Sequence, residues 1–164
     1  MARGAHAGFG RHQGEHSLLA LMFDTVAEVE SFMQDFEACR LPKQRWTHFA
    51  HLVAGFWYLS QHDMTHAVAT IRSRIRNHNE SVGTPNTDSS GYHETITRLY
   101  LTAIAAHIEL DKTLPFERSL AALLASPLAK SDWPLRYYTA QRLFSAHARL
   151  NWVEPDLSPQ GDSP

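Results

Sequence analysis

The chain has 164 residues with a formal net charge of −2, 11 histidines and one cysteine. A charge this close to neutral gives no electrostatic basis for a nucleic-acid partner. No apolar run approaches the ~20 residues needed to cross a bilayer, so no membrane partner is expected. The single Cys39 excludes an intramolecular disulfide and fits a reducing compartment. Since the first residues also lack the apolar stretch of a signal peptide, we expect a soluble, cytoplasmic protein.

The first helix is predicted by a capping box of Thr25 and Glu28, followed by apolar residues at helical spacing, and Pro42 ends it. The second helix is predicted to start after Thr47, a good N-cap residue. Its sequence HFAHLVAGFWYLS is apolar on nearly every face, which indicates burial on all sides. The four residues QHDM that follow are predicted to form a turn.

The third and fourth predicted helices differ in character. Residues 65–79 place their apolar side chains on one face and Arg72, Arg74 and Arg76 mostly on the other, which we interpret as a solvated face. Residues 92–109 are apolar over most of the helix circumference, which again indicates burial.

Shorter helices complete the prediction. A fifth helix carries Pro115 in its first turn, where proline is tolerated, and ends before Pro127. Residues 137–152 predict one or two short helices, and no segment alternates with a period of two for long enough to predict a strand. The predicted fold class is therefore all-α, a compact bundle of about five to six helices with an up-down core.

The two ends of the chain differ in composition from the stretch between them. Residues 1–17 are rich in Gly and His and poor in core formers, which predicts a flexible arm. Residues 158–164 are polar and Pro-rich and predict a disordered tail. Residues 18–157 contain no obvious linker or repeat and suit a single helical domain.

Polar residues gather at one end of the predicted bundle. Because short connections favour antiparallel neighbours, the second and fourth helices run parallel and start at the same end. His48 and His51 lie in the first turn of one, and His93 and Glu94 in the first turn of the other. The third helix ends there too, with Asn79 in its last turn.

These residues match the ligand set of a divalent metal. His48 and His51 are three apart and share a helix face. The positive end of each helix dipole favours neutral imidazole, the form that binds metals, and stabilises Glu94 as an anion. Three imidazoles and a carboxylate suit zinc, iron or manganese. We therefore predict His48, His51 and His93 as metal ligands, with Glu94 as a fourth ligand or a catalytic general base.

Structural explanations stand beside this prediction. His51 and Trp46 occupy the two positions of a hydrophobic staple if Thr47 is the cap. Glu94 can complement the helix dipole and pair with Arg98 at i+4. An H-x-x-H pair is a much weaker metal signal than H-E-x-x-H. The same end of the bundle can also form a pocket without metal.

The connection before the fourth helix adds substrate-binding candidates. Residues 80–91 are long for a bundle loop and dense in hydrogen-bonding side chains, although a self-satisfied surface loop is the alternative. Gly91 is predicted to serve as N-cap or to allow close backbone approach. With their neighbours on the flanking helices, the substrate-binding candidates are Asn79, Asn86, Asp88 and Arg98.

Three stretches carry a resemblance to a known family. The sequences RWTHFAHL, NTDSSGYHETITR and RLFSAHARLNWVEPDL resemble an uncharacterised family of small bacterial all-helical proteins with W-T-H-x-A-H-L and G-Y-H-E-T motifs. The resemblance covers about residues 20–157 and implies a compact helical domain, but it implies no activity. The general plan is also similar to DinB-like bundles, in which three histidines hold a metal, although the histidine spacing here departs from theirs.

Two functions follow as hypotheses. The first is a metal-dependent enzyme that acts on a small polar molecule through the His/Glu cluster. The alternative is a metal-free small-ligand binding or sensor protein that uses the same pocket. A third possibility is an interaction protein that forms a homodimer through an apolar surface.

Overall fold

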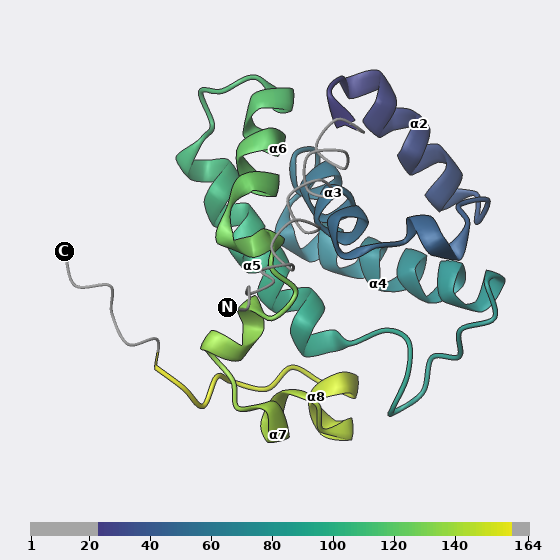
Figure 1. The fold of residues 1–164 in the computed structure, drawn as a ribbon, viewed down its shortest axis with the longest axis vertical. Coiled ribbons are helices and arrows are strands. Elements are labelled where there is room, and N and C mark those ends of the chain that lie inside the picture. The colour runs from purple at the N-terminus through teal and green to yellow at the C-terminus, as the bar shows by residue number, and fades with distance from the viewer. Residues whose placement is uncertain (1–22, 159–164) are drawn as a thin grey trace, which may run out of the picture.

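The computed structural model describes residues 23–158, whose regular elements are all helices, with no strand among them (Figure 1). The all-α class predicted from the sequence is confirmed. The elements in chain order are α2 (Val26–Glu37), η2 (Lys43–Arg45), α3 (His48–Leu59), α4 (Met64–Ser81), α5 (Glu94–Leu110), α6 (Phe116–Ala125), η3 (Pro127–Ala129), η4 (Trp133–Arg136), α7 (Ala140–Leu143) and α8 (Ala146–Leu150). The expected arm 1–17 lies outside the described residues, as do residues 159–164 of the expected tail.

Side-chain caps fix where the helices begin. Thr25 forms the expected capping box with Glu28, and the Thr47 hydroxyl accepts from a backbone N–H in the first turn of α3. Asp63 caps α4 in the same way, which places the start of α4 inside the predicted turn QHDM. The cap of α5 is His93, and Gly91 is not the N-cap.

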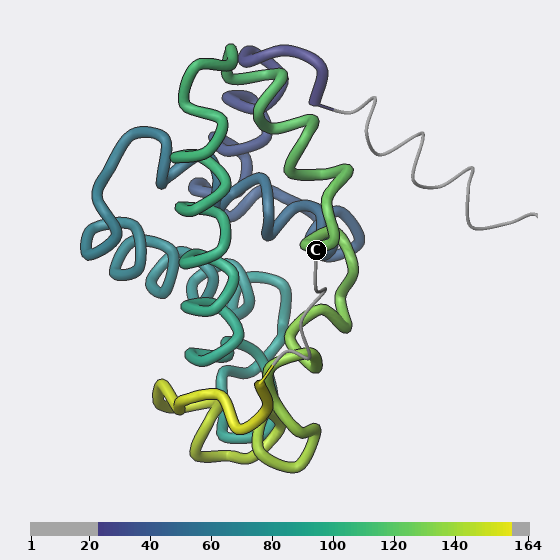
Figure 2. The backbone as a smooth tube through the Cα atoms, turned by 90° about the vertical axis from the view of Figure 1, so that its left-hand side faces the viewer, coloured from purple at the N-terminus to yellow at the C-terminus, as the bar shows by residue number. Residues whose placement is uncertain are grey.

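The core forms where α3 lies between its neighbours. Eight of its twelve residues are buried, as its apolar sequence predicted. Gly55 allows α5 to come close, because a Cβ atom at this position would lie 2.8 Å from Ile104 Cδ1 and 3.3 Å from Leu101 Cδ2. Helices α5 and α6 run antiparallel, whereas α4 crosses α5 at a steep angle (Figures 1 and 2).

A smaller apolar cluster lies under the C-terminal segment. Its buried members are Tyr138, Leu143, Ala148 and Val153. The Tyr138 hydroxyl donates to the Val153 carbonyl at 2.8 Å, which closes this segment on itself. Thr95, in the first turn of α5, donates to the backbone carbonyl of residue 151 at 2.7 Å. Helices α7 and α8 therefore lie against the start of α5 (Figure 1).

Histidines on α4 and α5 donate hydrogen bonds to the backbone of other segments. His78 Nε2 on α4 donates to the Leu41 carbonyl at 2.9 Å, and His107 Nε2 on α5 donates to the Ser119 carbonyl at 2.9 Å. A carbonyl oxygen only accepts, so the imidazole nitrogen carries the proton in each bond. Part of the high histidine content thus has a structural role.

None of the helices in the described range has both the length and the apolar content to cross a bilayer.

Candidate functional site

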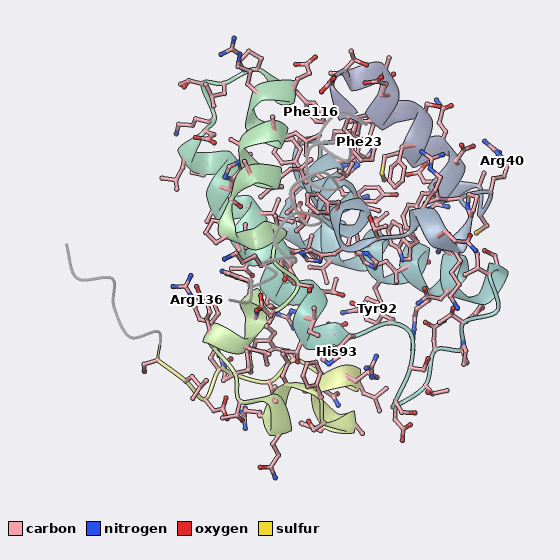
Figure 3. All side chains as sticks on the ribbon, in the orientation of Figure 1. Phe23, Arg40, Tyr92, His93, Phe116 and Arg136 are labelled. Carbon is pink, nitrogen blue, oxygen red and sulfur yellow. The ribbon has the colours of Figure 1, made fainter. Side chains whose placement is uncertain are left out.

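The first turn of α3 lies beside the first two turns of α5. The predicted topology had placed the starts of these two helices at the same end. The rings of His48 and Tyr100 are 5.1 Å apart. His51 of α3, Asn79 of α4 and the N-cap His93 line one cavity of about 380 Å³. Figure 3 shows His93 where α5 begins, above the C-terminal helices. His51, Asn79 and His93, which lie on three different elements, are therefore brought together at one place.

The imidazoles at this end do not share a metal centre. His48 Nε2 donates to the Leu128 carbonyl at 2.9 Å, whereas His93 Nε2 donates to the Leu143 carbonyl at 2.9 Å. His93 Nδ1 accepts from the Ile96 N–H at 3.3 Å, so both of its nitrogens are used. Burial lowers the pKa of His48 and of His93, and the carbonyl hydrogen bonds only partly offset this.

His51 also has a local role. Its Nδ1 donates to the Thr47 carbonyl at 2.7 Å, and its ring lies 4.1 Å from the Trp46 ring, the staple arrangement weighed above. Residues 23–158 contain no group of three His, Cys, Asp or Glu side chains placed to hold a metal ion. The predicted ligand set of His48, His51 and His93 is not assembled, because both nitrogens of His93 are engaged within the protein and the three rings are anchored to carbonyls of three separate segments.

Glu94 forms an ion pair with Arg72, which the sequence analysis assigned to a solvated helix face. Arg72 on α4 donates to both carboxylate oxygens, with Nε 2.9 Å from Oε2, and the Tyr92 hydroxyl donates to Oε2 at 2.8 Å. Glu94 is only 6% exposed. Burial raises the pKa of Glu94, but the hydrogen bonds from Arg72 and Tyr92 outweigh it and leave the pKa below its ordinary value. The alternative partner Arg98 lies instead over the Trp152 ring.

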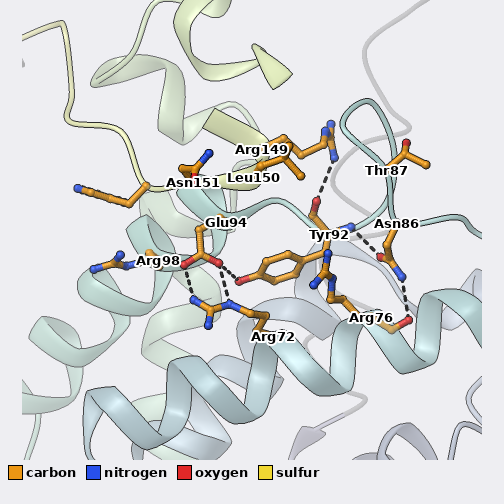
Figure 4. A pocket seen from close by; sticks show the side chains of 11 residues that line it. Arg72, Arg76, Asn86, Thr87, Tyr92, Glu94, Arg98, Arg149, Leu150 and Asn151 are labelled. Atoms are coloured by element: carbon orange, nitrogen blue, oxygen red, sulfur yellow. Dashed lines mark hydrogen bonds and ion pairs between the residues drawn. The ribbon is translucent and has the colours of Figure 1, made fainter. Parts of the chain in front are cut away.

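This ion pair forms part of the wall of a polar cavity of about 480 Å³, which we call the arginine cavity (Figure 4). Its walls come from α4, the 82–93 loop, α5, α8 and the segment after it. The lining residues are Arg72, Arg76, Asn86, Thr87, Tyr92, Glu94, Arg98, Arg149, Leu150, Asn151 and Trp152. Four guanidinium groups therefore line a space in which the described residues place one carboxylate.

The four arginines differ in how they are engaged. Arg72 is balanced by Glu94, and Arg149 Nη1 donates to the Gly91 carbonyl at 3.0 Å. Arg76 lies 5.8 Å from the centre of the Tyr92 ring, and Arg98 lies 5.1 Å from that of Trp152. Within residues 23–158, neither Arg76 nor Arg98 has a carboxylate partner within salt-bridge distance. These two guanidinium groups keep donors available for a ligand.

Asn86 organises the loop that forms one wall. Its Nδ2 donates to the Arg76 carbonyl at 3.0 Å, and its Oδ1 accepts from Asn79 Nδ2 at 3.0 Å and from the Tyr92 N–H at 3.1 Å. Gly91 has φ 74°, and a Cβ there would lie 2.5 Å from a backbone oxygen and 2.6 Å from Asn86 Oδ1. The expected close backbone approach at Gly91 is therefore present.

The predicted substrate-binding residues are divided between these places. Asn86 and Arg98 line the arginine cavity, and Asn79 lines the neighbouring cavity next to His51 and His93. Asp88 is exposed on the loop and is not part of the arginine cavity wall. Sequence reasoning missed Arg72 and Arg76 as site residues, although their i, i+4 spacing signals a shared face.

No family model, curated protein or solved structure matches the chain. The resemblance to small bacterial helical proteins therefore stays a prediction, and the function is argued from the site alone.

Proposed function

We propose that the protein binds a small anionic molecule, bearing phosphate or carboxylate, in the arginine cavity and without a metal. The observation that carries the proposal is the set of four arginines around one space of ligand size, where residues 23–158 place a single carboxylate. This keeps the ligand-binding alternative from the sequence. It shifts the site from the histidines to Glu94, Asn86, Arg98 and the arginines beside them.

Arginine suits this task because its planar guanidinium donates two parallel hydrogen bonds to a carboxylate or phosphate. Arg76 comes from α4 and Arg98 from α5, so an anion between them would receive donors from two helices. Each lies over an aromatic ring, on Tyr92 and Trp152 respectively. Such stacking restricts the side chain before a ligand arrives and lowers the entropy lost on binding.

Glu94 supports binding better than catalysis. Its carboxylate accepts three hydrogen bonds from Arg72 and Tyr92, and its lowered pKa makes it a weak general base at neutral pH. Its charge instead fixes Arg72 in the cavity wall. We therefore propose a binding or sensor protein, and we propose no chemical step.

The test is calorimetric titration of inorganic phosphate and citrate into the full chain at low ionic strength. At least one anion should bind, and Arg76→Gln and Arg98→Gln should each weaken it about tenfold, the loss expected for one charged hydrogen bond. Arg118→Gln is the matched control, because Arg118 is exposed on α6 and lies outside the arginine cavity. Equal affinities in all three variants would refute the proposal.

A further inference from the structure

A third cavity, of about 300 Å³, lies between α3, α4 and α5 and adjoins the cavity of about 380 Å³, with which it shares four lining residues; we call it the apolar cavity. Its lining residues are His48, His51, Leu52, Ile71, Ile75, Ile96, Thr97, Tyr100, Leu101 and Ile104. It shares no residue with the arginine cavity, and no Asp, Glu, Lys or Arg of the described chain lines it. An ion would gain nothing there, so the space suits a neutral molecule.

The volume limits the size of that molecule. A protein cavity of ~150 Å³ lined by aliphatic side chains holds benzene. The apolar cavity has about 300 Å³, which is room for two fused rings. Its aliphatic wall matches the apolar lining that small-molecule sites show, with a few polar groups to fix orientation.

The polar side chains of the wall are those of His48, His51, Thr97 and Tyr100, and the three with rings offer acceptors. His48 Nε2 and His51 Nδ1 both donate to backbone carbonyls, so the second nitrogen of each neutral ring carries a lone pair. Residues 23–158 give neither of these second nitrogens a hydrogen bond. The Tyr100 hydroxyl donates to the Lys130 carbonyl at 3.0 Å, so its oxygen has only lone pairs left to offer. These three side chains offer a ligand acceptors and no donor.

We propose that the apolar cavity binds a small neutral molecule of about two fused aromatic rings that carries an N–H or O–H donor. The donor meets an imidazole nitrogen of His48 or His51, and the rings contact the isoleucine and leucine side chains. His51 is exposed and His48 half-buried, which puts the hydrogen-bonding end at the mouth of the cavity. Burial lowers the pKa of His48, so its ring is an uncharged acceptor at neutral pH.

Indole and benzofuran provide a matched pair of probes, because they share a shape and differ in a ring N–H against a ring oxygen. NMR titration of the labelled full chain should show indole binding, with benzofuran about fivefold weaker or more, the loss expected for one neutral hydrogen bond. The variants His48→Phe and His51→Phe each keep a ring but lose the acceptor nitrogen. At least one of them should bind indole and benzofuran equally. Equal binding of both probes, or an unchanged preference in both variants, would overturn the proposal.

Ile96→Trp tests the location. Ile96 is half-buried on α5 and lines the apolar cavity, so the larger ring should fill the space and abolish indole binding. Leu99→Trp is the control, because Leu99 is also half-buried on α5 but lies outside this cavity. Absent indole binding in the wild-type chain, or binding that survives Ile96→Trp, would overturn the proposal. None of these results depends on the arginine cavity binding an anion.

Discussion

Arg72 of α4 and Glu94 in the first turn of α5 form a bidentate ion pair where α4 crosses α5. The Glu94 side chain is almost fully buried, whereas the Arg72 side chain is 41% exposed. One pair thus joins two helices and places a carboxylate in the wall of the arginine cavity.

Glu94→Gln should separate these two roles. The free energy of unfolding should fall by about 2 kcal/mol, because charged hydrogen bonds are lost and Arg72 is left without its counter-ion. Anion affinity should rise in the same variant, since the only carboxylate that the described residues place in the cavity is removed. Urea unfolding and calorimetry measure the two effects. Glu109→Gln, in an exposed pair with Lys112, should change neither quantity measurably.

Buried histidines should make the fold less stable as the pH falls below about 6.5, above the range in which carboxylates titrate. The pKa values of His48 and His93 are lowered by burial from the ordinary 6.5, so the unfolded chain takes up protons first as the pH falls. The free energy of unfolding should therefore be constant above about pH 7 and decrease below about 6.5. Glu94, whose pKa is also lowered by its partners, adds a further loss below its ordinary value of 4.5. A flat profile from pH 7.5 to 5 in urea unfolding would contradict this.

Asn86→Ala should release the loop of residues 82–93. The loss removes hydrogen bonds to Arg76, Asn79 and Tyr92, and we expect a destabilisation of about 1–2 kcal/mol. Amide exchange in the loop should accelerate, as measured by mass spectrometry. Asp88→Ala on the same loop should leave exchange unchanged, and equal acceleration in both variants would show that Asn86 does not hold the loop.

Alanine substitutions at Gly83 and Gly91 distinguish the cost of backbone strain from the cost of steric crowding. Gly83 and Gly91 both have φ 74°, so alanine at either position costs about 1 kcal/mol from the left-handed conformation. A Cβ at Gly83 meets nothing within 4 Å, whereas one at Gly91 meets Pro85 O and Asn86 Oδ1. Gly91→Ala should therefore have a clearly lower melting temperature than Gly83→Ala in thermal unfolding. Similar melting temperatures would show that the loop shifts to accept the extra Cβ atom at little energetic cost.

Local signals in the sequence predicted much of the fold. Thr25 and Thr47 mark helix starts because capping depends on neighbouring residues. The uniform apolarity of α3 predicted its burial, and the assumed up-down topology placed the starts of α3 and α5 at the same end. The up-down reading did not predict the steep crossing of α4 over α5, which side-chain packing decides (Figure 2).

The site was harder to predict because its contacts are long-range. Arg72 and Glu94 are 22 positions apart, and Arg149 reaches the Gly91 carbonyl across 58. The histidines suggested a metal because imidazole is a good ligand, but hydrogen bonds to backbone carbonyls hold their rings on three separate segments. A carbonyl acceptor leaves no trace in the sequence, since every residue carries one.

The most direct test is a crystal structure of the protein with tungstate, a tetrahedral dianion shaped like phosphate, located by its anomalous scattering. We predict a tungstate ion in the arginine cavity, within hydrogen-bond distance of the guanidinium groups of Arg76 and Arg98, and its loss in the Arg76→Gln/Arg98→Gln double variant. An empty arginine cavity, or an ion equally occupied in the double variant, would contradict the account.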